Sequence, residues 1–283
     1  AGNAFATDTD CENRAIDPAA QRIVDEHAHE FAVTYYGKHD ADAVSAAYRD
    51  YFDAAVSYGD HWDEHAAEQY VNHCPRMLVT QFMRDRTVPC EDMRWAVGDE
   101  SLPEQIAAVR RLATEGAERY AVLVDRNTSA SVTMDAHARR LFEDSIALHA
   151  RVYKHCYHAT ELTCRALEEG LAEDWQHAFF SAGLARREFR RARAAMLGRE
   201  HGRWHGFYAN ECLTDIAQSA WVMSGLMALL RTMGDGPHFY QWQRDFIYSR
   251  EEAKIMTLLN LENHLTDDEM FDAMLVKWED RTW

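Results

Sequence analysis

Side chains that could bind a ligand gather in one stretch of the sequence, Gly198–Ile247. It opens with the letters HGRWHGFYANE, in which aromatic and polar residues stand beside glycines that interrupt helices. Trp and Tyr faces stack on the C–H surfaces of sugars, while the polar side chains could hydrogen-bond hydroxyls or a carboxylate. The predicted ligand-facing residues are Arg203, Trp204, His205, Tyr208, Asn210 and Glu211, with Arg203 as the partner of a carboxylate.

Two interpretations of this stretch stay open. The aromatic residues could form the wall of a binding cleft, or an apolar plug where the last helices dock. Glu211 and Asp215 do not favour glycoside hydrolysis, because residues at i and i+4 lie side by side on a helix and cannot flank a glycosidic bond. We therefore expect no catalytic residue here. A second aromatic cluster closes the stretch with His238, Phe239, Tyr240 and Trp242.

A zinc site is the alternative chemistry. His61, Glu64 and His65 fit the H-x-x-E-H pattern of inverted zinc peptidases, in which both histidines share a helix face and the glutamate is the base. A helix start just before them also explains the acidic residues, since carboxylates are favoured near a helix N-terminus. Glu26 and His29 supply half of a di-iron signature, but a second Glu-x-x-His is missing. We expect no cofactor and no resident metal.

Charge and composition exclude several partners. The formal net charge of −17 argues against nucleic acid, because binding phosphates needs clustered Lys and Arg. The basic run Arg186–Arg199 is interpreted as a solvated helix face that pairs with acidic neighbours, or as a site for a carboxylate-bearing ligand. No apolar run approaches the ~20 residues of a membrane span, which predicts a soluble protein without membrane contact. Six cysteines without a CxxC favour free buried thiols and a reducing compartment such as the cytoplasm.

The elements that must position these residues are helices. Apolar residues recur with a period of 3.6 almost everywhere and strand-like alternation is nearly absent, which predicts an all-α, multi-helix bundle with one or two very long antiparallel helices. The expected helices are 18–36, 40–56, about 60–86 with Pro75 breaking or kinking it, 102–126, 130–169 as one helix or two, 172–197, 210–233 and 267–280, with short helices near 238–248 and 250–260. The expected parts are a leader or linker at 1–17, an N-terminal helical part at 18–86, a loop at 87–100 and a bundle at 101–283, or one continuous domain 18–283.

The chain also resembles a known family. Residues 8–56 are similar to the segment that leaves the catalytic barrel in large glycoside hydrolases of the family 115 α-glucuronidase type. The stretch Gly202-Arg203-Trp204 is similar to a Gly-Lys-Trp stretch late in that family's helical C-terminal region. The residues that carry the first similarity are Asp10, Glu12, Pro18, Ala32, Tyr36, Gly37, Ala41, Val44, Tyr48 and Tyr51.

The resemblance implies a helical, non-catalytic region of a carbohydrate-active hydrolase. The family's catalytic carboxylates lie on a barrel, and this chain has no βα alternation to form one, so no catalytic residue is carried over. The region would wall a cleft for a carbohydrate or acidic sugar, or mediate dimerisation or association with a catalytic barrel domain. A stand-alone metalloenzyme using His61, Glu64 and His65 is the second hypothesis, and a structural or interaction module without a ligand is the third.

Overall fold

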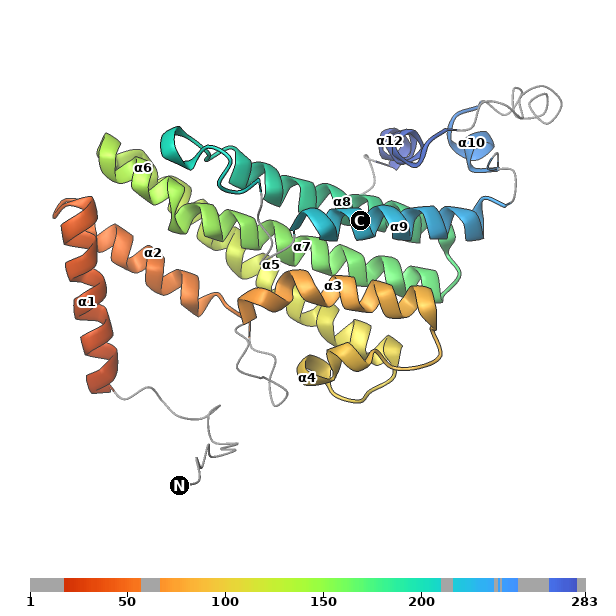
Figure 1. The fold of residues 1–283 in the computed structure, drawn as a ribbon, viewed down its shortest axis with the longest axis horizontal. Coiled ribbons are helices and arrows are strands. Elements are labelled where there is room, and N and C mark those ends of the chain that lie inside the picture. Colours follow the sequence, from red (N-terminus) through yellow and green to blue (C-terminus); the bar gives the residue numbers. More distant parts are fainter. Residues whose placement is uncertain are drawn as a thin grey trace.

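The computed structural model describes residues 18–56, 67–209, 216–236, 239, 241–248 and 265–278 of the chain. Within these ranges every regular element is an α-helix or a short 3-10 helix, so the all-α prediction is confirmed. Figure 1 shows α1 (Pro18–Tyr36) and α2 (Ala41–Asp53) set to one side of a larger group of helices. None of the helices in the described ranges has both the length and the apolar character that crossing a bilayer requires.

The larger group is built from long helices that pack side by side. They are α5 (Leu102–Thr133), α7 (Ile146–Leu171), α8 (Trp175–Leu197) and α9 (Ile216–Gly234). The helix α5 packs on α7, α7 on α8, and α8 on α9, while α3 (Ala67–Arg84) lies against α7 and α9. Each helix turns an apolar stripe toward its neighbours, and these stripes form one continuous core.

Two glycines allow an aromatic ring of another helix to approach the backbone closely. A Cβ atom added at Gly116 of α5 would stand only 2.4 Å from the ring of Tyr157 on α7. A Cβ added at Gly183 of α8 would stand 2.2 Å from the ring of Phe271, on α12 (Asp267–Trp278). Glycine is therefore required at both places by the aromatic ring that faces it, and not by the local backbone conformation.

Several helix ends follow from local sequence signals. Ser101 and Glu104 form a capping box, in which the Glu104 carboxylate accepts from the Ser101 amide at 3.0 Å. Thr266 and Glu269 do the same at the start of α12, at 2.7 Å. Gly37 ends α1 with a φ of 88°, a conformation that favours glycine. These three boundaries confirm the predictions made from the sequence.

The segment 130–169 is divided more finely than expected. The helix α5 continues to Thr133, and Asp135 then caps α6 (Ala136–Asp144) by accepting hydrogen bonds from two backbone amides of its first turn. Ser145, with φ −121° and ψ −110°, separates α6 from α7. The second break places Asp144 and Ser145 at a helix junction, where their side chains are free to reach other elements.

Two further expectations need comment. The helix α3 runs through Pro75 without ending there, so Pro75 does not break the helix, and the kink that was the alternative stays a prediction. The expected loop 87–100 contains a 3-10 helix at Glu91–Met93 and a single-turn helix, α4 (Arg94–Val97). The buried Gln105 side chain holds this loop, because its oxygen accepts from the Cys90 amide at 2.7 Å and its nitrogen donates to the Gly98 carbonyl at 2.9 Å. The division into domains stays a prediction.

Candidate functional site

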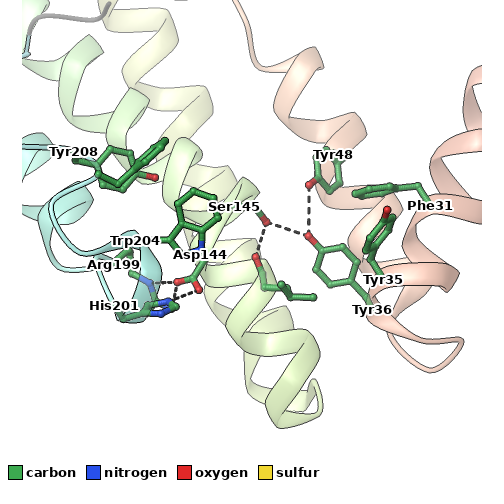
Figure 2. A pocket seen from close by; sticks show the side chains of 12 residues that line it. Phe31, Tyr35, Tyr36, Tyr48, Asp144, Ser145, Arg199, His201, Trp204 and Tyr208 are labelled. Carbon is green, nitrogen blue, oxygen red and sulfur yellow. Dashed lines mark hydrogen bonds and ion pairs between the residues drawn. The ribbon is translucent and has the colours of Figure 1, made fainter. Parts of the chain in front are cut away.

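An aromatic pocket of about 430 Å³ lies where the α1–α2 pair meets the α6–α7 junction and the segment that follows α8. Figure 2 shows one group of aromatic side chains from α1 and α2 and another from the segment after α8, with Asp144 and Ser145 between them. The lining residues are Phe31, Tyr35, Tyr36, Tyr48, Leu141, Asp144, Ser145, Arg199, His201, Trp204, Phe207 and Tyr208.

The aromatic walls are much more exposed than ordinary core residues. Trp204 and Phe207 are 57% and 58% exposed, and their rings meet edge to face with centroids 5.2 Å apart. On the opposite wall, Phe31 and Tyr35 are also exposed, with ring centroids 4.8 Å apart. Apolar aromatic surface in contact with water is unfavourable, so two facing clusters of this kind favour a ligand between them.

A hydroxyl network forms the part of the pocket that joins α1, α2 and α7. Ser145 donates its hydroxyl proton to the Leu141 carbonyl at 2.6 Å, and the Tyr36 hydroxyl donates to the Ser145 oxygen at 3.0 Å. The Tyr48 hydroxyl lies 3.5 Å from that of Tyr36. Burial is the main cause that raises the pKa of Tyr36 well above its ordinary value, so this phenol stays protonated and remains a donor.

A charged cluster forms the opposite polar part of the lining. The Asp144 carboxylate accepts from Arg199 Nε and from His201 Nε2, both at 2.7 Å. Arg199 also donates to Glu143 at 3.2 Å. The guanidinium is therefore already bonded to two carboxylates before any ligand arrives.

Glu200 shapes the segment that carries Trp204 and Phe207. Its carboxylate accepts from the backbone amides of Gly206 at 2.9 Å and Tyr208 at 2.7 Å. These two bonds fold the segment back on itself after the 3-10 helix Gly202–Trp204, and Gly206 permits the turn with a φ of 76°. The tight fold brings Trp204, Phe207 and Tyr208 onto one wall of the pocket.

The structure brings together only some of the predicted ligand-facing residues. Trp204 and Tyr208 line the pocket, whereas Arg203 and His205 are exposed and do not line it. Asn210 and Glu211 lie outside the described residues. Arg203 as the partner of a ligand carboxylate therefore gains no support from the lining, and the guanidinium that does line the pocket is that of Arg199.

The plug interpretation holds for part of the stretch. Tyr208 packs against the core, but the exposure of Trp204 and Phe207 excludes a core role for them in the described structure. In the second aromatic cluster, Trp242 on α10 (Gln241–Phe246) is buried edge-to-face against Phe179, with ring centroids 5.2 Å apart. This tryptophan is a core residue, while His238 and Tyr240 lie outside the described residues.

Several lining residues were not predicted as site residues. The sequence does offer a signal for one wall, because Phe31 and Tyr35 are four residues apart and share a helix face. Asp144 carried no signal, because no Gly or Pro marks the helix junction that exposes it.

The other chemical hypotheses find little in the described residues. His61, Glu64 and His65 lie outside them, so the zinc site stays a prediction. Glu26 and His29 are exposed on α1, and among the described residues no group of three His, Cys, Asp or Glu side chains could hold a metal ion. The four described cysteines are buried free thiols, as expected: Cys74, Cys90, Cys156 and Cys164.

Part of the basic run Arg186–Arg199 is bonded to other residues of the chain. Arg186 is buried and donates to Asp268 of α12 and to Ser224 of α9, so it is not part of a solvated face. Arg191 and His155 both donate to the buried carboxylate of Glu188, the latter at 2.7 Å. Pairing with acidic neighbours is thus correct for these residues.

Family models, curated proteins and solved structures were each compared with the chain, and none of the three comparisons found a match. The function is therefore argued from the aromatic pocket itself.

Proposed function

We propose that this chain is a non-catalytic, ligand-binding helical module whose aromatic pocket holds a carbohydrate. The observation that carries the proposal is the opposition of two exposed aromatic clusters across one pocket, with Phe31 and Tyr35 on one wall and Trp204 and Phe207 on the other. Aromatic faces pack on the C–H faces of sugar rings, and hydroxyl groups need donors and acceptors beside those faces.

The polar groups of the pocket match that requirement. Tyr36, Tyr48 and Ser145 offer hydroxyls, and Asp144 and His201 add a carboxylate and an imidazole. A pocket of about 430 Å³ falls within the roughly 300–1,000 Å³ range of small-molecule sites. These features support a ligand the size of a monosaccharide or disaccharide.

The same lining supports a role without catalysis. Glycoside hydrolysis needs two carboxyl groups placed on either side of the scissile bond. Asp144 is the sole carboxylate among the residues that line the aromatic pocket, and it is bonded to Arg199 and His201. The proposal therefore agrees with the resemblance to the helical region of family 115 glycoside hydrolases, in which hydrolysis belongs to a barrel.

Trp204 provides the direct test. We expect Trp204→Ala to weaken binding of neutral methyl glycosides at least roughly tenfold, because one aromatic wall is lost. Binding would be measured by calorimetric titration of the full chain, and far-UV circular dichroism would confirm that helicity is kept.

The matched control is Trp221→Ala. Trp221 is 74% exposed on α9 and does not line the pocket, so its removal deletes the same side chain elsewhere. Equal binding by both variants and the original chain, or no glycoside binding at all, contradicts the proposal.

Association with a catalytic barrel domain or with a second copy of the chain remains a separate proposal. The observation in its favour is the outward face of α9, where Trp221, Gly225 and Ala228 are exposed at helical spacing. Sedimentation analysis of the purified chain would show whether it associates with itself.

A further inference from the structure

The charges around the aromatic pocket are unbalanced. Asp144 lines it, Glu143 stands behind Arg199, and Glu200 holds the turn that carries Trp204. Against these three carboxylates, the cluster offers the guanidinium of Arg199 and the imidazole of His201. Among the lining residues alone, Asp144 faces Arg199 and His201, so the excess of carboxylates comes from Glu143 and Glu200, which lie just outside the lining.

Arg199 is poorly placed to receive an anionic ligand. Its Nε donates to Asp144 at 2.7 Å and its Nη1 to Glu143 at 3.2 Å. A ligand carboxylate that bonded to the remaining N–H groups of Arg199 would stand beside the carboxylates of both Asp144 and Glu143. Arg203 and Arg140 also adjoin lining residues in the sequence, but their side chains are exposed and screened by solvent, whereas Glu143 and Glu200 are half-buried.

The aromatic walls, like the carboxylates, favour a positively charged ligand. The faces of Trp, Tyr and Phe rings carry partial negative charge and attract cations. Seven of the lining residues are aromatic, from α1, α2 and the segment after α8. Burial is the main cause that raises the pKa of Tyr208, and the charges of Asp144 and Glu200 add to it.

We infer that the aromatic pocket selects a ligand with a positively charged group, so that a protonated amino sugar binds more tightly than the corresponding neutral or acidic sugar. The ammonium group would lie between the aromatic faces and Asp144, while the sugar ring uses the hydroxyls of Tyr36 and Tyr48. The inference rests on the proposed carbohydrate function and reverses the expectation of an acidic sugar.

Three methyl glycosides that share the same sugar ring and differ in charge test the inference. The full chain is titrated with methyl glucosaminide, methyl glucoside and methyl glucuronide at about pH 6, where the amine is protonated. We expect the amino sugar to bind roughly 2- to 30-fold more tightly than the neutral one, and the acidic sugar to bind most weakly. Choline and its neutral carbon isostere form a second pair that contains no sugar ring.

Variants locate the origin of the preference. Asp144→Asn removes the carboxylate in the pocket and one of the two carboxylate partners of Arg199, so the differences in affinity among the three sugars should shrink or change sign. Glu143→Gln removes the other partner without changing a lining residue, and it should act in the same direction if Asp144→Asn fails to fold. Glu118→Gln removes one exposed carboxylate on α5, away from the pocket, and should leave the order unchanged.

Each outcome is decisive. Tightest binding of the amino sugar supports the inference. Equal or tighter binding of the neutral or acidic sugar, with choline no better than its isostere, overturns it while the carbohydrate function stands. If choline binds more tightly than its isostere and no sugar binds, the preference for a positive charge is supported and the carbohydrate function is overturned. No binding by any probe overturns both.

Discussion

Aromatic side chains gather in two neighbouring regions of this molecule, with opposite exposure. Between α2, α5 and α7, the rings of Tyr51, Tyr120 and Tyr157 are buried, and Tyr120 stacks on Tyr157 with centroids 5.4 Å apart. In the aromatic pocket, Trp204 and Phe207 are more than half exposed. Edge-to-face ring contacts occur in both regions, but the rings of the first are buried in the core and Trp204 and Phe207 are not.

The difference shows why one aromatic cluster is closed and the other is open. In the buried cluster, Gly116 leaves room for the ring of Tyr157, and the Tyr120 hydroxyl donates to the Tyr51 carbonyl at 3.2 Å. Among the described residues, none closes the space between the two walls of the pocket in this way. Exposure thus depends on how the helices end and not on residue composition.

The largest expected contrast is in stability. Tyr120→Ala should lower the free energy of unfolding by roughly 3–5 kcal/mol, because it leaves a cavity among buried rings. Trp204→Ala should change it by less than about 0.5 kcal/mol, as for exposed substitutions. Urea denaturation followed by circular dichroism measures both. Similar losses in the two variants would remove the distinction between core and pocket aromatics.

A pair of glycine substitutions gives the next largest effect. Gly116→Ala should cost roughly 1–3 kcal/mol, since the added methyl group meets the Tyr157 ring at 2.4 Å. Gly225→Ala on α9, where nothing lies within 4 Å of the added Cβ, should instead stabilise the protein by about 0.4–1 kcal/mol. Thermal denaturation compares the two. A stabilising Gly116→Ala would mean that α5 and α7 are less closely packed than described.

The smallest expected effect is the change of stability with pH that a buried carboxylate, Glu188, causes. Burial acts to raise the pKa of Glu188, but hydrogen bonds from His155 and His158 and the charges of His158 and Arg191 lower it below its ordinary value overall. A carboxylate with a lowered folded-state pKa stabilises the protein above its unfolded pKa, and this stabilisation is lost as the pH falls. Between about pH 5 and pH 3 the loss should reach roughly 1.5 kcal/mol.

Glu188→Gln removes this titration, so its stability should fall less steeply with acid than that of the original chain. Denaturation midpoints at several pH values measure the slope, and Glu118→Gln, at an exposed carboxylate of α5, serves as the charge-matched control. An unchanged acid slope in Glu188→Gln would show that the histidines do not hold Glu188 in its ionised form.

The sequence predicts much of the fold because its helix-end signals act locally. Ser101 with Glu104, Thr266 with Glu269, and Gly37 each fix a boundary through a few adjacent residues. The start of α6 also has a local signal, the N-cap Asp135, which was not among the predicted boundaries. The break at Ser145 has no Gly or Pro, and there the Ser145 hydroxyl contacts Tyr36 of α1, far away in the sequence.

The site was predictable only in part, for the same reason. Trp204 and Tyr208 stand out because the segment 201–208 gathers three aromatic residues around two glycines. The spacing could not show that Arg199, rather than Arg203, would face the pocket, because the fold of the turn depends on bonds between Glu200 and two amides. Phe31 and Tyr35 look like core residues until the absence of a covering helix in the described structure is known.

The division of the pocket between two parts of the fold has a thermodynamic consequence. The pair α1–α2 supplies one aromatic wall, and the α6–α7 junction and the segment after α8 supply the rest. A ligand that needs both walls binds only when they are together, so binding and the docking of α1–α2 are linked equilibria. At a ligand concentration 100 times the Kd, the docked state gains about 2.7 kcal/mol, which would appear as slower hydrogen exchange of the α1 amides.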